Sequence, residues 1–83
     1  MTWKVKFSKD AEKQFFKLSK NIRSRIISKL EDVQESPFTY IQRMVGSKNY
    51  RLRVGDYRLI FEVINDKLLL HIIRVDKRSR MYQ

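Results

Sequence analysis

Two runs of alternating side chains, Tyr50–Val54 and Tyr57–Ile64, are separated only by Gly55 and Asp56. Glycine at the first of two central positions favours a type II′ turn, whose twist suits a β-hairpin. A loop of this length also fixes which residues pair across the two strands. The sequence therefore predicts a hairpin of defined register at the centre of the chain.

The register sorts the side chains of this hairpin onto two faces. Leu52 is predicted to lie opposite Leu59, on an apolar face that belongs to the core. Arg53 is predicted to lie opposite Arg58, with Arg51 on the same face. Directly opposed like charges destabilise a strand pair by some tenths of a kcal/mol to about 1 kcal/mol. Because folding does not require this pairing, we expect the arginines to hold an anion.

The composition narrows the classes of protein and of partner. The 83 residues are expected to form one domain, residues 1–83, and the net charge is +10. A domain this basic usually meets nucleic acid, an acidic partner or an anionic membrane. The chain has no cysteine and one histidine, which excludes disulfides, thiol catalysis and metal sites built from cysteine or histidine clusters. We expect no cofactor and no metal.

The apolar runs are far shorter than the roughly 20 residues of a membrane span. The first residues also lack the apolar region of a signal peptide. The sequence therefore predicts a cytoplasmic protein with no membrane partner.

The residues before the hairpin predict one strand and two helices. Residues 2–7 alternate as in a half-buried strand. Ser8 is a good N-cap for a first amphipathic helix, and Ser19 can cap a second. Pro37 ends the second helix, since the residue before proline disfavours the α conformation. The apolar residues between 38 and 45 are expected to pack against the sheet or the helix ends.

A second turn signal, at residues 65–66, precedes a third strand at residues 67–75. If the loop between the two strands has two residues, His71 would lie opposite Ile60, and Arg74 would fall on the core side. The predicted fold is α+β: an N-terminal strand, an antiparallel helical hairpin and an antiparallel β-meander. The helices are expected on one sheet face, with the other face partly open.

The residues on this open face that could bind a ligand or take part in a reaction are basic. They are Arg51, Arg53 and Arg58 on the hairpin and Lys77, Arg78 and Arg80 after the third strand, with Tyr82 nearby. Guanidinium groups bind phosphate oxygens in pairs and can stabilise the charge of a phosphate transition state. A tyrosine can stack on a nucleobase. The set could orient an RNA 2′-OH for attack on its neighbouring phosphate, and a face that only binds RNA fits the residues equally well.

The motifs Y-R-L-R-V-G-D-Y-R-L-I-F-E-V at residues 50–63 and V-D-K-R-S-R-M-Y at residues 75–82 resemble the RelE/ParE toxin superfamily. The resemblance covers residues 3–82. It implies the toxin of a type II toxin–antitoxin system that inhibits translation by cutting messenger RNA in the ribosomal A site. The fold it implies, RelE-like, agrees with the order of elements predicted above.

The resemblance also implies roles for individual residues. The positions that match the catalytic set of the family are Arg51, Arg53, Arg58, Arg78 and Tyr82. Arg58 and Arg78 would bind and stabilise the phosphate, and Tyr82 would stack on or orient the nucleotide. Lys77, Arg80 and His71 are predicted to contact RNA.

One departure from the family pattern concerns the general base. RelE toxins often carry lysine at the positions of Arg51 and Arg53, and arginine is effectively never deprotonated. Arg53 is therefore not expected to accept the proton. Lys77, His71, Tyr82 or a ribosomal group could do so.

The partners implied by the resemblance are the ribosome, messenger RNA and a cognate antitoxin. The antitoxin would wrap the toxin with an acidic, amphipathic segment in a heterotetrameric complex. Two other functions stay open from the sequence: inhibition of DNA gyrase, as in the ParE branch, and a non-catalytic module that binds RNA or a partner.

Overall fold

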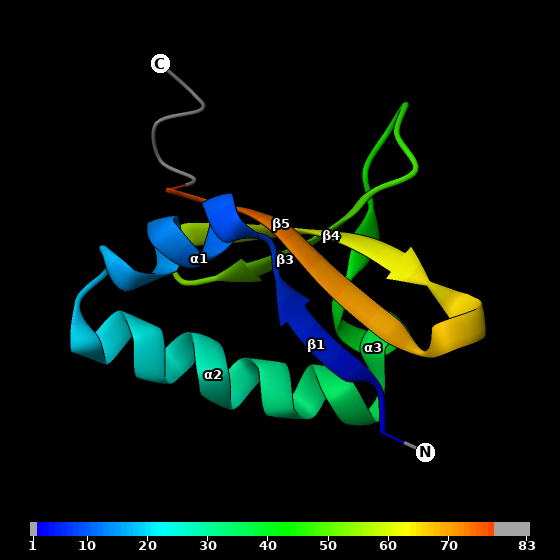
Figure 1. Ribbon diagram of the computed structural model, residues 1–83, viewed down its shortest axis with the longest axis horizontal. Helices are drawn as coiled ribbons and strands as arrows, with labels where there is room; N and C mark the ends of the chain where they lie inside the picture. Colours follow the sequence, from blue (N-terminus) through cyan, green and yellow to red (C-terminus); the bar gives the residue numbers. More distant parts are fainter. Residues whose placement is uncertain (1, 78–83) are drawn as a thin grey trace.

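The computed structural model describes residues 2–77, so the predictions on Arg78, Arg80 and Tyr82 lie outside the described residues. The helices are α1 (Lys9–Phe16), α2 (Lys20–Glu35) and α3 (Pro37–Tyr40), and the strands are β1 (Lys4–Phe7), β2 (Gln42–Arg43), β3 (Tyr50–Val54), β4 (Tyr57–Ile64) and β5 (Leu69–Lys77). The strands form one sheet in the order β1-β5-β4-β3-β2, with α1 and α2 on one side of it (Figure 1). The predicted α+β fold is confirmed.

The sheet is mixed because β1 runs parallel to its neighbour β5, whereas the other neighbours are antiparallel. Beyond the end of β1, the start of α1 continues the contact with β5. The Ser8 N–H donates to the Ile72 carbonyl oxygen at 2.8 Å, and the Gln14 side chain accepts from the Val75 N–H at 2.8 Å. The first helix is therefore fixed to the sheet by backbone groups that lack a strand partner.

Both predicted helix starts are confirmed by their caps. The Ser8 hydroxyl accepts from the Ala11 N–H at 3.0 Å, and the Ser19 hydroxyl accepts from the Ile22 N–H at 3.4 Å. These bonds satisfy N–H groups that have no partner inside the helix. Pro37 ends α2 as predicted and opens the short α3.

The core lies between this helical layer and one sheet face. It is built mainly from Ile26, Leu30 and Val33 of α2 and from Leu52, Leu59, Phe61, Leu70 and Ile72 of the sheet. The hairpin register is confirmed, with Leu52 opposite Leu59. Gly55 has φ +59°, which fits the first central position of the expected type II′ turn.

The predicted turn between β4 and β5 is wrong. Instead of a two-residue loop, residues Asn65–Lys67 form a 3₁₀ turn, and Leu68 adopts a left-handed conformation with φ +48°. The longer connection shifts the register of β5. His71 therefore lies opposite Glu62 and not opposite Ile60.

A β-bulge shifts the register a second time. Phe61 pairs with Ile72, but its neighbour Ile60 pairs with Arg74, which leaves Ile73 as the extra residue. An extra residue turns the following side chains to the opposite faces. Arg74 thus lies on the open side of the sheet, and the prediction that it falls on the core side is wrong.

The segment after α3 packs less than the sequence suggests. Ile41 is buried, but Val45 is fully exposed and Phe38 keeps 54% of its surface exposed. The Phe38 ring contacts Trp3 and Tyr50 edge-on, with ring centroids 5.9 Å and 5.8 Å apart. Among residues 2–77, no helix combines the length and the apolar character needed to span a membrane.

A pair of phenylalanines tests where the stability of this domain resides. Phe61 is fully buried, and Phe16 is 61% exposed. We expect Phe61→Ala to lower the free energy of unfolding by about 3–5 kcal/mol, because it leaves a cavity in a thin core. Phe16→Ala should change it by less than about 1 kcal/mol. Urea denaturation followed by circular dichroism measures both, and equal losses would contradict the assigned core.

Candidate nucleic-acid interface

The open face, defined as the sheet face opposite α1 and α2, carries a row of charged residues beside the hairpin turn. Arg53 of β3 lies directly opposite Arg58 of β4, which in turn lies opposite Asp76 of β5. The predicted pairing of the two arginines is thus confirmed. Two like charges and one opposite charge share this end of the face.

Arg58 is the arginine of this row with an unused buried donor. Its Nε atom is shielded from solvent and has no hydrogen-bond partner within the described part of the chain. The carboxylate of the neighbouring Asp76 instead forms a salt bridge with the Nε atom of Arg74, at 2.9 Å. A buried donor without a partner costs roughly 1–3 kcal/mol, and such a group in a folded protein calls for an explanation. A bound anion would satisfy it.

Arg51 belongs to the next row of the open face. It lies opposite Ile60, which lies opposite Arg74. Ile60 is only 5% exposed although it is on the side away from the helices. The aliphatic stems of long basic side chains can provide such cover while their charged ends stay in solvent.

The third row contains the single histidine. The His71 Nδ1 atom lies 2.9 Å from an oxygen of Glu62, its cross-strand neighbour. Since an ionised carboxylate only accepts, Nδ1 is the donor, and Nε2 is left for other contacts. Glu62 is four residues from Arg58 along β4, or roughly 13 Å at the rise of a strand. His71 and Arg58 are therefore well separated along the open face.

Lys77 lies on the other side of the sheet from Arg53 and Arg58, which together are called the arginine row. It follows Val75 by two residues and shares its face, and its side chain borders a groove with Gln14 and Tyr57 near α1. The arginine row and Lys77 thus do not meet. The other predicted tail residues, Arg78, Arg80 and Tyr82, lie outside residues 2–77.

Two residues that the sequence analysis missed lie at the β3 edge of the sheet. Lys29 of α2 and Tyr40 of α3 line a groove together with Arg51 and Arg53, and the Lys29 ammonium nitrogen lies 4.7 Å from the centre of the Tyr40 ring. In the sequence, Lys29 is one of many basic residues on the outer side of a helix. Only the tertiary arrangement brings it to the arginines.

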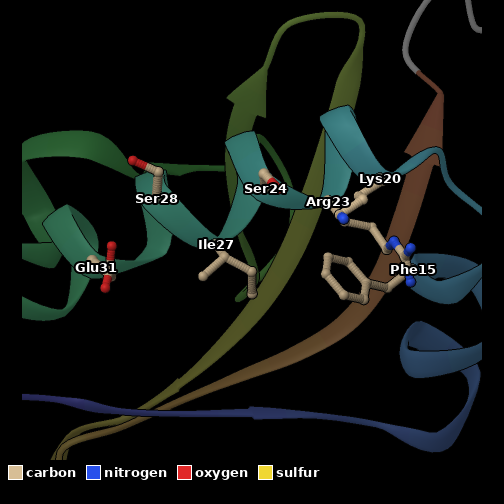
Figure 2. Close-up of a pocket in the computed structure, with 7 residues that line it drawn as sticks. All are labelled: Phe15, Lys20, Arg23, Ser24, Ile27, Ser28 and Glu31. Atoms are coloured by element: carbon tan, nitrogen blue, oxygen red, sulfur yellow. The ribbon is translucent and has the colours of Figure 1, made fainter.

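A second groove lies on the helical layer. Its apolar floor comes from Phe15 and Ile27, with Lys20 and Arg23 at one end and Glu31 at the other. Figure 2 shows Arg23 reaching from α2 toward the Phe15 ring, with Ile27 one turn further along the helix. The Arg23 Nε atom is buried without a partner among the described residues, and its guanidinium lies 5.8 Å from the Phe16 ring centre.

Comparison with known proteins places the chain in a family. A family model described as the ParE toxin of the type II toxin–antitoxin system matches residues 5–82. The mRNA interferase toxin RelE of Escherichia coli K12 is 32% identical over 83 residues, an alignment that covers 96% of this chain and 87% of the relative.

Solved structures share the fold. The toxin in the RelBE toxin–antitoxin complex of Escherichia coli is 31% identical with a TM-score of 0.77, covering 90% of this chain and 95% of that one. An archaeal RelE–RelB complex from Pyrococcus horikoshii gives 26% identity and a TM-score of 0.81, covering 96% and 99%. These relatives were crystallised with RelB antitoxins. The chain therefore belongs to the RelE/ParE superfamily of type II toxins.

Proposed function

We propose that this toxin is an endoribonuclease that cuts messenger RNA in the ribosomal A site and thereby inhibits translation. The observation that carries the proposal is the opposed pair Arg53 and Arg58, in which a buried Arg58 donor has no partner within residues 2–77. A phosphate would relieve the repulsion and satisfy the donor at the same time. The homology to an mRNA interferase supports RNA as the source of that phosphate.

The proposed reaction is an internal phosphoryl transfer. The 2′-oxygen of a nucleotide attacks the adjacent phosphorus, a new O2′–P bond forms, and the bond from phosphorus to the 5′-oxygen breaks. Negative charge grows on the phosphate oxygens in the transition state, where Arg58, together with Arg78 from the family pattern, stabilises it. Arg51 and Arg53 hold the strand in position.

The reaction also needs an acceptor for the 2′-OH proton and a donor for the leaving 5′-oxygen. Arginine cannot take the proton. Glu62, the cross-strand neighbour of His71, lies four residues or roughly 13 Å from Arg58 along β4. Lys77 borders the helical side of the sheet. We therefore assign proton removal to Tyr82 or to a ribosomal group, and RNA contacts to His71, Lys77 and Arg80. This assignment predicts that cleavage depends on the ribosome.

Arg58→Gln tests the phosphate role directly. We expect A-site cleavage to fall about a hundredfold or more, since one preorganised donor is worth roughly that much in kcat. The thermal stability should be unchanged or slightly higher, because the substitution removes a repulsion. Primer extension on a message translated in a cell-free extract measures the first effect, and thermal unfolding measures the second.

Lys67→Gln is the matched control, since Lys67 is an exposed cation in the 3₁₀ turn between β4 and β5. It should leave cleavage unchanged. A large drop in melting temperature for Arg58→Gln would show a structural arginine instead. An intact message together with blocked DNA supercoiling by gyrase would replace the proposed function with that of the ParE branch, whose family model this chain matches.

Tyr82 offers a second test, which rests on the family pattern. If its ring stacks on the nucleotide, Tyr82→Ala should lower cleavage by about tenfold or more with little change in stability. Tyr82→Phe should keep most activity in that case, and should lose it if the hydroxyl carries the proton. Primer extension in the same extract separates these outcomes, and full activity of Tyr82→Ala would remove Tyr82 from the site.

We further propose that the groove on the helical layer receives the antitoxin. An acidic side chain of the partner would pair with Arg23 and Lys20, and an apolar one would cover Phe15 and Ile27. The segment that carries them wraps the toxin in a heterotetramer of two toxin and two antitoxin chains. A basic toxin and an acidic, amphipathic partner are complementary in charge.

Ile27→Ala tests this contact, because Ile27 is 44% exposed in the groove. We expect roughly tenfold weaker binding of the cognate antitoxin in a calorimetric titration, with the fold retained. Val45→Ala is the control, since it removes a fully exposed apolar side chain from the loop between β2 and β3. Equal affinities of the two variants would show that the groove is not the antitoxin site.

A further inference from the structure

The groove at the β3 edge is lined mainly by basic and polar residues. It has a volume of about 430 Å³ and lies between α2, α3 and β3. Three of its lining residues are cations, namely Lys29, Arg51 and Arg53, and Tyr40 is its aromatic side chain. No carboxylate is found among the described residues that line it. The groove is thus a cationic hollow with one accessible ring.

The groove exists because the sheet edge is left open at this point. Strand β2 has two residues and pairs with Tyr50 and Arg51, so within residues 2–77 the rest of β3 has no strand on that side. The side chains of Arg51 and Arg53 belong to the open face by alternation, yet both residues also line the groove. The two arginines therefore connect the open face with the groove around the edge of the sheet.

Lys29 and Tyr40 prepare the groove for a planar ligand. The ammonium of Lys29 lies 4.7 Å from the centre of the Tyr40 ring, a distance at which the cation and the ring attract each other. This contact orients the ring, which keeps 36% of the residue surface exposed. A cation and an aromatic ring side by side are the combination that single-stranded nucleic-acid sites use for phosphate and base.

We propose that this groove is a nucleotide subsite for single-stranded RNA that continues from the arginine row. A phosphate binds Lys29 and Arg53, and the attached base stacks on Tyr40. The proposal deepens the proposed function, since it takes RNA as the ligand of the open face. An acidic protein segment is the weaker candidate, because Leu52, the aliphatic residue of the lining, is only 2% exposed and offers no apolar contact.

Binding to an RNA that cannot be cut tests the subsite without any need for cleavage. The probe is a fluorescent dodecamer of 2′-O-methyluridine, titrated with the isolated protein and followed by fluorescence anisotropy. We expect Tyr40→Ala to bind roughly tenfold more weakly with an unchanged salt dependence, as for the loss of one stacked base. Lys29→Gln should reduce the magnitude of the slope of log K against log salt by about 1, the share of one phosphate contact.

Two controls make the result specific. Tyr40→Phe keeps the ring and should bind like the parent protein. Lys67→Gln removes the same charge as Lys29→Gln but lies in the turn between β4 and β5, so its slope should stay close to that of the parent. A dodecamer with abasic sugars should bind equally to the parent and to Tyr40→Ala, because it has no base to stack.

Several results would overturn the subsite. They are a parent that does not bind the dodecamer, Tyr40 and Lys29 variants that bind it like the parent, and an equal loss of affinity for the abasic strand. Weaker binding of the antitoxin with unchanged RNA binding would assign the groove to a protein partner. The test is separate from the proposed function: a parent that fails to cut messages but shows the Tyr40 effect disproves the cleavage and keeps the subsite.

Discussion

The two-residue turn at Gly55 and Asp56 is the constraint on which the rest of the domain depends. It sets Leu52 opposite Leu59 inside the core and, by the same register, Arg53 opposite Arg58 outside it. A slip by one residue would turn the leucines to solvent and the arginines into the core. The arginine pair and the core are therefore specified together, and neither can change register alone.

The arginine row shows a local conflict that the fold tolerates. Opposed guanidinium groups are unfavourable, and so is a buried donor that has no partner in the described part of the chain. In a domain this small, about 1–2 kcal/mol is a large share of the total stability. Natural proteins break such rules chiefly at functional sites. A bound phosphate would resolve the conflict, so the same contacts that weaken the free protein would strengthen such a complex.

The sequence predicts local features of this fold better than distant ones. Ser8, Ser19 and Gly55 act within a few residues, and their caps and turn are found as expected. The pairing of β4 with β5 is missed because residues 65–66 resemble a tight turn, while the left-handed Leu68 extends the connection. The bulge at Ile73 is missed as well, because β5 contains no glycine or proline that would mark it. The groove of Lys29 and Tyr40 is likewise set by tertiary contacts.

The bulge also decides which side chains of β5 make contacts on the open face. By turning Arg74 and Asp76 to the open face, it allows them to pair at 2.9 Å, and the next row pairs His71 with Glu62 at the same distance. Both of these side-chain contacts thus involve β5, on the side of the sheet toward β1. The arginines of β3 lie across the sheet from these pairs. On the opposite edge of the open face, Lys4 and Lys6 of β1 have no ion pair among the described residues. Unpaired positive charge therefore flanks the β5 contacts on both sides, and on the β3 side Arg51 and Arg53 also line the groove.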